Sequence, residues 1–389
     1  MKAKERYDDH EDTKVAIQTF IQHFETENNV KLVHTKLDGD ITKAGSNYCS
    51  RILRLKFEYY KGNTIVSDSI LLKVPSLSVN YEAILKASIY DNEMYVYQHL
   101  LPSLYKIWNG ERFTPIFYAC TEAKVLILED LTKSGFKPRN KKDRLDLTHS
   151  RAAIAGLATF HAVTVKYLQQ LESRREPIAQ SLLEPIRPAN FKEQAEHFYH
   201  QVLLIVKGRT TESVMQKLRN FQDKLVTTSP YHINSDRNNL TVIAHGDCWT
   251  TNILFQYDDK GEVTGTRMVD WQISRKTSAV VDLIYLFVTG LQFDVFRDHQ
   301  DELINLYLET VNKTLSMVDA NCTYTRAQFN EDVQTYKYLF LNLLINAIPL
   351  AVHDAEMFFK DNIVADNPPA ELIEFMTNWL TYLDNKDFL

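Results

Sequence analysis

The chain has 389 residues, of which 44% are apolar and 24% charged, and its formal net charge is −6. These values are ordinary for a globular protein and exclude a disordered chain, while the length favours two lobes or domains over a single core. Because the net charge is negative and no Lys/Arg-rich run is interleaved with aromatic residues, the sequence predicts no nucleic-acid partner.

The cysteines and the apolar runs bear on the cellular compartment. Four cysteines are widely spread without a CxxC pair, which favours reduced thiols and the cytoplasm over a disulfide framework or a zinc site. The first fourteen residues lack the apolar core of a signal peptide. The most apolar later run, residues 338–352, is too short for a membrane span and predicts a buried helix near a chain bend. The sequence gives no indication of the oligomeric state.

The first 130 residues are predicted to be mostly antiparallel sheet. Residues 15–27 carry apolar side chains at helical spacing, which predicts an amphipathic helix on the surface of this lobe. From Leu53 to Tyr59 the apolar residues alternate with charged ones, as in a strand. A turn at residues 61–63 and a second strand at residues 64–74 then complete a hairpin. A helix is expected over residues 80–101, and two more strands within residues 114–130.

After residue 130 the spacing of apolar residues becomes mainly helical. The exceptions are residues 240–247 and 265–271, which predict two short neighbouring strands joined by a turn near residues 258–261. The sequence therefore predicts an α+β fold. Its antiparallel-sheet lobe would span residues 1–130, and a mostly helical lobe would span residues 131–389.

Polar side chains follow both of these strands. Asp247 comes two residues after His245 at the end of the first strand, Asn252 follows five residues later, and Asp270 ends the second strand. Phosphoryl transfer needs a carboxylate that orients or deprotonates the accepting hydroxyl, and oxygen ligands for Mg²⁺. Asp247 suits the first task, and Asn252 with Asp270 suits the second. His245 is expected to hold the loop and not to transfer protons.

A cation for the nucleotide phosphates is available in the sheet lobe. Lys73 ends the strand "SILLKV", and Glu93 on the following helix could hold it by an ion pair. The segment "LILEDL" suits an interlobe hinge whose backbone, at Glu129 and Leu131, would meet adenine. The backbone amides near Gly45 would cover the phosphates. Side-chain bonds to the phosphates would come from Ser46 or Asn47.

The ordered motifs resemble a known family. "HGDCWTTNILF", "MVDWQ" and "VVDLIYLF" are similar to the signature of the choline kinase and aminoglycoside phosphotransferase superfamily, and more closely to its insect ecdysteroid kinase-like (CHK kinase-like) family. Upstream, "AGSNYCSRILRLK", "ILLKVP", "YDNEMYVY", "LILEDL" and "LATFHA" match the family's further segments in order, over nearly the whole chain. Trp271 stands where the family has phenylalanine, which puts the packing there in question.

This resemblance implies a two-lobed protein-kinase-like fold and ATP- and Mg²⁺-dependent phosphorylation of small-molecule hydroxyls, ecdysteroids being the named acceptors. Carried over by motif, Asp247 is the catalytic base and Asn252 and Asp270 bind Mg²⁺. Lys73 contacts the phosphates and Glu93 anchors it. A protein kinase is disfavoured because Trp-Gln follows Asp270 and no Ala-Pro-Glu motif is present.

Other interpretations stay open at this stage. Asp247 could be a turn residue, Asn252 a helix cap and Lys73 an exposed strand end, while Asp282 could approach the catalytic loop or cap the helix that it begins. A choline or ethanolamine kinase would need an aromatic cage. Aromatic and acidic residues near the C-terminus could supply one: Trp379, Tyr382 and Phe358 with Glu356 or Asp354. A catalytically silent ligand carrier is the non-enzymatic alternative.

Overall fold

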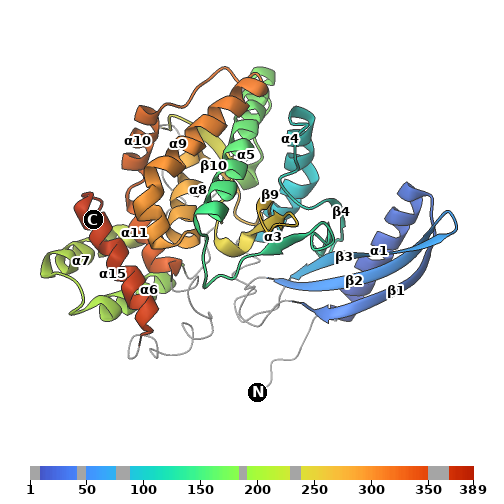
Figure 1. The fold of residues 1–389 in the computed structure, drawn as a ribbon, viewed down its shortest axis with the longest axis horizontal. Coiled ribbons are helices and arrows are strands. Elements are labelled where there is room, and N and C mark those ends of the chain that lie inside the picture. The colour runs from blue at the N-terminus through green and yellow to red at the C-terminus, as the bar shows by residue number, and fades with distance from the viewer. Residues whose placement is uncertain (1–8, 42–49, 76–87, 184–190, 228–237, 349–367) are drawn as a thin grey trace.

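A computed structural model describes residues 9–41, 50–75, 88–183, 191–227, 238–348 and 368–389. The molecule is elongated, with a twisted sheet and helix α1 at one end and a bundle of helices at the other (Figure 1). No described helix has both the length and the apolar character needed to cross a bilayer.

The sheet at the first end has five antiparallel strands in the order β1-β2-β3-β5-β4. The strands are β1 (Leu32–Asp40), β2 (Ser50–Lys61), β3 (Thr64–Pro75), β4 (Phe117–Cys120) and β5 (Leu126–Glu129). The predicted hairpin is confirmed, since β2 and β3 pair from Ser50 with Pro75 to Lys61 with Thr64.

Helix α1 (Asp9–Asn28) covers one face of this sheet and confirms the predicted amphipathic helix. Phe20 and Phe24 contact Phe57 of β2, with ring centroids 5.0 Å apart in both pairs. Because side chains alternate along an extended chain, Ile127 of β5 and Val125, just before this strand, face this small core. Leu126 and Leu128, on the other face of β5, belong to the larger core.

A helical segment passes from the sheet towards the C-terminal lobe. It comprises α3 (Ile89–Tyr95), a π-helical turn (Val96–Leu100) and α4 (Leu101–Ile107). These elements confirm the described part of the helix expected over residues 80–101. Their apolar side chains, including Tyr97 and Leu104, are buried in the same core as α5 (Leu147–Arg174).

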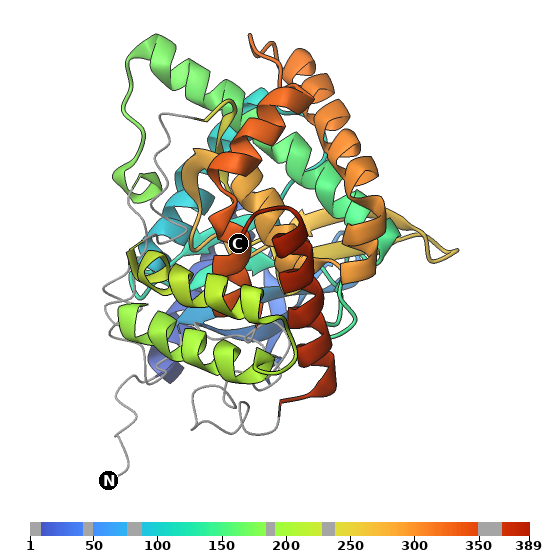
Figure 2. The ribbon, with the colours of Figure 1, turned by 90° about the vertical axis from the view of Figure 1, so that its left-hand side faces the viewer.

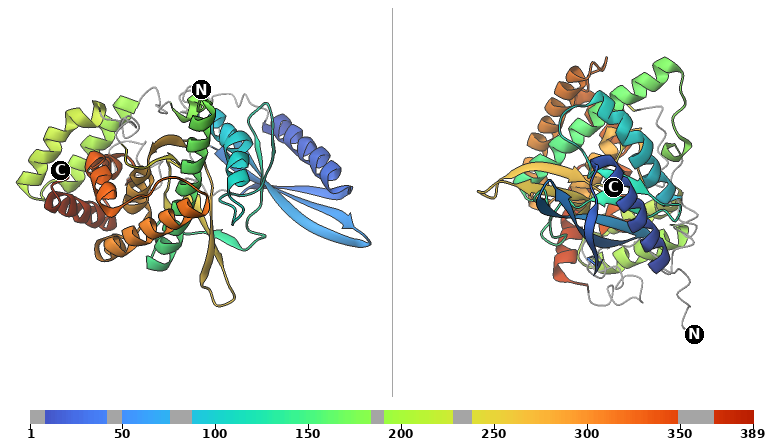
Figure 3. Two further views of the ribbon diagram at one scale, coloured as in Figure 1. Left: turned by 90° about the horizontal axis from the view of Figure 1, so that it is seen from above. Right: turned by 90° about the vertical axis from the view of Figure 1, so that its right-hand side faces the viewer.

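The second lobe is mostly helical, as predicted. Figure 2 looks onto the end formed by α6, α7 and α15, and Figure 3 shows the sheet with α1 projecting away from the other helices. The longest helices of the second lobe, α5 and α9, pack along each other. After α5 the helices are α6 (Phe191–Val206), α7 (Glu212–Thr227), α8 (Ala279–Tyr285), α9 (Phe293–Met317), α10 (Arg326–Thr335), α11 (Tyr338–Asn346) and α15 (Ala370–Asn385).

The strands of this lobe pair differently from the prediction. β7 (Thr241–Ala244) pairs with β10 (Arg275–Ser278), whereas β9 (Val263–Met268) pairs with β8 (Ile253–Tyr257), which in turn pairs with β6 (Phe136–Pro138). The prediction that the strands before Asp247 and Asp270 are neighbours was therefore wrong. Residues 245–252 separate β7 from β8, and the turn at residues 258–261 joins β8 to β9.

The predicted α+β class, with an antiparallel-sheet lobe and a mostly helical lobe, is confirmed. The boundary at residue 130 stays a prediction. Helix α11 confirms the first part of the predicted buried helix, and residues 349–352 lie outside the described ranges. Cys120, Cys248 and Cys322 are free thiols, while Cys49 lies outside these ranges.

Candidate active site

A cleft of about 200 Å³ lies between the sheet and the second lobe. It brings together side chains from β3, α3, the end of β5 and the segments that flank β8 and β9. Six predicted site residues line it: Lys73, Glu93, Glu129, Leu131, Asn252 and Asp270. Residues more than 190 positions apart in the sequence thus share one cavity.

Lys73 occupies the centre of a charge cluster. Its ammonium Nζ lies 2.7 Å from Glu93 Oε2, which is the predicted ion pair, and 2.9 Å from Asp270 Oδ1. Burial opposes the positive charge, but the carboxylates of Asp270 and Glu93 outweigh it and raise the pKa of Lys73. Burial raises the pKa of Glu93 despite the opposing charge of Lys73. Lys73 is therefore a paired cation, not an exposed strand end.

Helix α3 also fixes the segment that carries Asp270. Glu93 Oε1 accepts a hydrogen bond from the backbone amide of Trp271 at 3.3 Å. The neighbouring Asn92 donates through Nδ2 to the carbonyls of Gln272 and Ser274, at 3.1 and 2.9 Å. Asp270 has a φ of 68°, a left-handed conformation that a non-glycine residue adopts only when its surroundings impose it. Two adjacent residues of α3 thus hold the backbone that follows this strained position.

Asp247 lies in the loop after β7 with both carboxylate oxygens engaged. Oδ2 accepts from Asn252 Nδ2 at 3.0 Å, and Oδ1 accepts from the Tyr285 hydroxyl at 2.6 Å. Burial, followed by the nearby charge of Asp270, raises the pKa of Asp247 to about 7. A carboxyl group with a pKa near neutrality can accept a proton and release it again, which suits general base catalysis.

The backbone of this loop is held by Asp282, a fully buried residue in the first turn of α8. Its carboxylate accepts from the amides of His245 and Gly246, at 2.6 and 2.8 Å, and its Oδ2 lies 3.0 Å from His161 Nε2. Burial opposes ionisation, but the contacts with His161 and the loop outweigh it and lower the pKa of Asp282. Of the two roles considered for Asp282, contact with the catalytic loop is the one observed.

His245 has the structural role expected of it. Its Nε2 lies 3.0 Å from the carbonyl of Val269, and its Nδ1 accepts from the amide of Asp247 at 3.2 Å. Burial lowers the pKa of His245, which keeps the ring neutral with one nitrogen free to accept. His245 therefore links the segment before Asp247 to the segment before Asp270.

We expect Asp282→Asn to destabilise the protein by about 1.5–3 kcal/mol at neutral pH, because it removes the buried carboxylate that accepts hydrogen bonds from the amides of His245 and Gly246. The pKa of Asp282 is lowered in the folded state, so its contribution is present above the unfolded pKa and is lost as pH falls through the folded value. Urea unfolding should show a constant difference from wild type between about pH 5 and 8 that shrinks in stronger acid. A difference that grows in acid would contradict this assignment.

The oxygen donors at the cleft suit Mg²⁺. Asn252 uses its Nδ2 to donate to the carbonyl and carboxylate of Asp247, which turns its Oδ1 away from them. Asp270 uses Oδ1 for Lys73. Within the described ranges, Asn252 Oδ1 and Asp270 Oδ2 have no hydrogen-bond partner. Because Mg²⁺ takes one or two protein oxygens and completes its shell with water and phosphate, these two donors are sufficient.

The predicted hinge follows β5. Asp130 is buried and bonded to Arg54 Nε at 2.6 Å and to Ser69 Oγ at 2.7 Å, which ties the hinge to β2 and β3. The side chain of Glu129 turns away to accept from the amide of Ile116. The amide of Leu131 has no acceptor in the described part of the chain, so it is available for a ligand in the cleft. Gly45, Ser46 and Asn47 lie outside the described residues.

The aromatic predictions have separate outcomes. Trp271 is fully buried and packs against His245 and Phe160, with ring centroids 4.4 and 4.9 Å apart, so this core accepts the larger ring. Trp379 is only 1% exposed and stacks on Phe296, so it cannot line a cage for a cation. The other proposed cage residues are Tyr382, which bonds Gln300, and Phe358, Glu356 and Asp354, which lie outside the described ranges.

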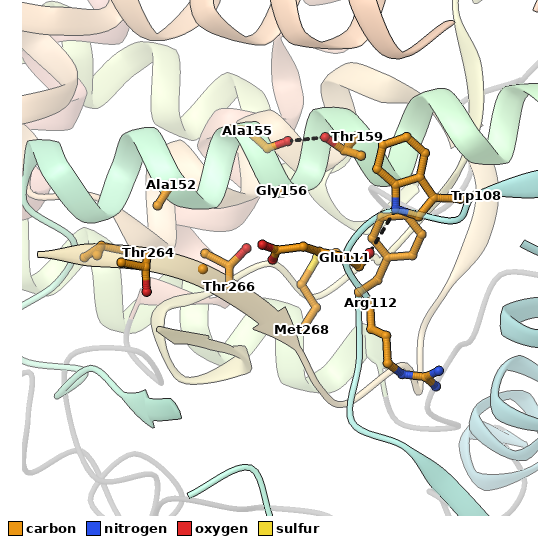
Figure 4. A pocket seen from close by; sticks show the side chains of 13 residues that line it. Trp108, Glu111, Arg112, Ala152, Ala155, Gly156, Thr159, Thr264, Thr266 and Met268 are labelled. Carbon is orange, nitrogen blue, oxygen red and sulfur yellow. Dashed lines mark hydrogen bonds between the residues drawn. The ribbon is translucent and has the colours of Figure 1, made fainter. Parts of the chain in front are cut away.

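Sequence reasoning missed the contact between Tyr285 and Asp247. The "DLIY" motif was noted, yet its tyrosine received no role, because nothing local indicates that a residue 38 positions away reaches the catalytic loop. Of two further pockets, the first contains none of the predicted residues and the second contains only Tyr382. The first, of about 320 Å³, lies between α5, β9 and residues 108–113 (Figure 4), and the second, of about 330 Å³, lies among α8, α9, α10 and α15.

Comparisons with known proteins identify a family for most of the chain. Residues 44–320 match the model of the ecdysteroid kinase-like family. Among solved structures, an ethanolamine kinase of Plasmodium vivax is similar, with a TM-score of 0.43 and 11% identity, covering 98% of this chain and 92% of that one. An aminoglycoside phosphotransferase of Streptomyces rimosus has a TM-score of 0.31 and 13% identity, covering 83% and 98%. No curated protein matches the sequence significantly.

Proposed function

The chain belongs to the ecdysteroid kinase-like family, and from this premise we propose that it is a small-molecule kinase. It uses ATP and Mg²⁺ to phosphorylate a hydroxyl group of a lipophilic acceptor, with ecdysteroids as the first candidates. The observation that carries the proposal is the convergence of three separate segments, which contribute Lys73, Asp270, and the pair Asp247 and Asn252. The free thiols of Cys120, Cys248 and Cys322 are compatible with a cytoplasmic enzyme.

The residues of the cleft divide the work of phosphoryl transfer. Lys73, held by Glu93, would bind the nucleotide phosphates, and the backbone near Glu129 and Leu131 would meet adenine. Asn252 and Asp270 would hold Mg²⁺, which when bound neutralises charge on the phosphate oxygens. Gly45, Ser46 and Asn47 remain proposed phosphate contacts on the basis of the sequence alone.

Asp247 would act on the acceptor. The acceptor oxygen bonds to the γ-phosphorus of ATP, the bond from that phosphorus to the leaving ADP oxygen breaks, and the hydroxyl proton passes to the Asp247 carboxylate. Tyr285 and Asn252 fix that carboxylate by one hydrogen bond to each oxygen. Each oxygen retains a further lone pair for the incoming hydroxyl.

The first test is thermal unfolding of the full chain with ATP and Mg²⁺. A ligand that binds only the folded state stabilises it by about 2.7 kcal/mol at one hundred times its Kd, so the midpoint should rise. The rise should require Mg²⁺ and should be lost in Asp270→Ala. A matched control is Asp259→Ala in the exposed β8–β9 turn, which should respond as wild type does. No shift at saturating nucleotide would contradict the nucleotide half of the proposal.

The acceptor is then sought by mass spectrometry after incubation with ATP, Mg²⁺ and hydroxyl-bearing sterols, with choline and ethanolamine included. A mass increase of one phosphoryl group on a sterol supports the lipophilic acceptor. Turnover of choline or ethanolamine in its place would assign the alternative kinase class. Binding of ATP with no turnover of any acceptor would instead favour the silent carrier.

A further inference from the structure

Arg144 is a buried cation that no predicted motif contains. It lies in the loop between β6 and α5, and only 6% of its surface is exposed. Its φ of 52° is left-handed, which is uncommon for a residue with a long side chain. Burial lowers the pKa of this guanidinium to about 10, so the group stays charged at neutral pH. A strained backbone and a buried charge both require compensation from the surroundings.

The compensation comes from the end of a helix. α8 continues into the π-helical turn η5 (Leu286–Gly290), whose last carbonyls have no partner within the helix. Arg144 Nη1 donates to two of them, Val288 O at 3.3 Å and Thr289 O at 3.2 Å. A positive charge at this end also interacts favourably with the helix dipole. Arg144 therefore caps the helix formed by α8 and η5.

A second contact joins this cap to α15. The guanidinium carbon of Arg144 lies 3.7 Å from the centroid of the Phe375 ring, within the range of a cation–π interaction. Arg144 Nη2 is buried and finds no hydrogen-bond partner in the described part of the molecule. Among the described residues, the carboxylate whose charge favours this guanidinium is Glu371, also on α15. The aromatic face and the helix end thus provide its stabilising contacts.

The capped helix contacts the loop of residues 245–252 at three positions along its length. Asp282, in its first turn, holds the amides of His245 and Gly246. Tyr285, at the end of α8, donates to Asp247. Gly290, at the end of η5, accepts from Thr250 Oγ1 at 3.1 Å and from the amide next to Arg144 at 2.9 Å. Any axial or rotational shift of this helix therefore moves the partners of Asp247.

We propose that Arg144 is a positioning residue that locks the helix of α8 and η5 against the catalytic loop and thereby sets Tyr285 on Asp247. It does not touch the reacting atoms. The effect on turnover rests on the proposed kinase function, whereas the effect on the order of the loop does not. The experiment below keeps these two parts separate.

The main variant is Arg144→Gly, because glycine removes the side chain and also suits the left-handed φ. Its matched control is Arg175→Gly, since Arg175 has a φ of 56°, is exposed and follows the far end of α5. Hydrogen exchange is measured by mass spectrometry on the full chain. In Arg144→Gly, we expect exchange about 10–100-fold faster over residues 245–252 and 279–290, as loss of charge-assisted hydrogen bonds implies, with other segments unchanged. Arg175→Gly should exchange as wild type does in both segments.

Turnover provides the second arm once an acceptor is known. Arg144→Gly should lower kcat by about tenfold or more while the KM for ATP changes less, because Lys73, Asp270 and the hinge lie outside the two affected segments. If Arg144 acts through Tyr285, the double variant with Tyr285→Phe should lose no more than the larger single loss. Additive losses would overturn this route.

Phe375→Leu gives an independent variant should Arg144→Gly fold poorly. It removes the aromatic face without changing the backbone at residue 144, and it should raise exchange in the same two segments. Wild-type exchange over residues 245–252 in a folded Arg144→Gly or Phe375→Leu protein would overturn the proposal. A wild-type protein that transfers phosphate to no acceptor would instead count against the kinase function, and the exchange data would still decide the role of Arg144.

Discussion

Replacing Asp247 with asparagine is expected to lower kcat for phosphoryl transfer by about 10²–10⁴-fold, the range typical for loss of a positioned general base. Asparagine keeps the shape of the side chain, and its one oxygen can still accept from either Asn252 or Tyr285, but it cannot take the acceptor proton. Binding of ATP and Mg²⁺, followed by thermal shift, should be retained. Asp259→Asn, in the exposed turn, is the matched control and should keep full turnover. Full turnover by Asp247→Asn would exclude Asp247 as the base.

The same variant carries a pH signature in the absence of nucleotide and metal. The pKa of Asp247 is raised to about 7 in the folded state, so its contribution to stability is largest when the carboxyl is protonated and is lost as pH rises through about 7. Asparagine does not titrate. The free energy of unfolding of Asp247→Asn relative to wild type should therefore increase from about pH 4 to 7 and then level off. A difference in free energy of unfolding that stays constant across this interval would mean that folding does not raise the pKa of Asp247.

Lys73→Met is expected to have the second large effect. It should abolish most nucleotide-dependent turnover, with losses on the order of 10²–10³-fold for a missing phosphate contact. It also leaves the buried Glu93 without its partner, which should cost about 3–5 kcal/mol of stability. Both quantities can be measured, the first by initial rates and the second by urea unfolding.

A second substitution separates the two effects of Lys73→Met. Adding Glu93→Gln removes the unpaired carboxylate, so the double variant should recover much of the lost stability but none of the lost turnover. This outcome would assign Glu93 to anchoring Lys73. If the stability losses simply add, the two side chains are not energetically coupled, and the ion pair has no role in holding the site together.

The local sequence pattern was sufficient to predict the elements whose apolar residues follow a clear strand or helix period. The β2–β3 hairpin follows from strict alternation and a turn at residues 61–63, and α1 follows from its apolar spacing. The pairing of β7 with β10 could not be read in this way, because the intervening residues contain a second hairpin that is equally compatible with the pattern. Strand order depends on contacts between distant segments, which periodicity does not encode.

The candidate site likewise has some features that the local sequence predicts and others that depend on contacts between distant segments. Lys73, Asp247, Asn252 and Asp270 could be proposed from the sequence because their chemistry and order are recognisable, and the predicted Lys73–Glu93 ion pair is confirmed. The contact of Tyr285 with Asp247 and the positioning role proposed for Arg144 were not predicted, since both depend on long-range contacts in the fold. The candidate residues for phosphoryl transfer lie in recognisable sequence motifs. The residues that hold them in place can come from any segment that the fold brings nearby.

The double contact of α3 with the segment after Asp270 has a consequence for how the cleft can open. Asn92 and Glu93 bind that segment, and the continuation of α3 is buried in the same core as α5. Helix α3 should therefore travel with the helical lobe as one rigid body. Strands β2 and β3 and helix α1, which share a core of their own, are then the part that can swing. Opening would stretch the link from Lys73 on β3 to Glu93 on α3, so closure of the cleft and assembly of the charge cluster would occur as a single event.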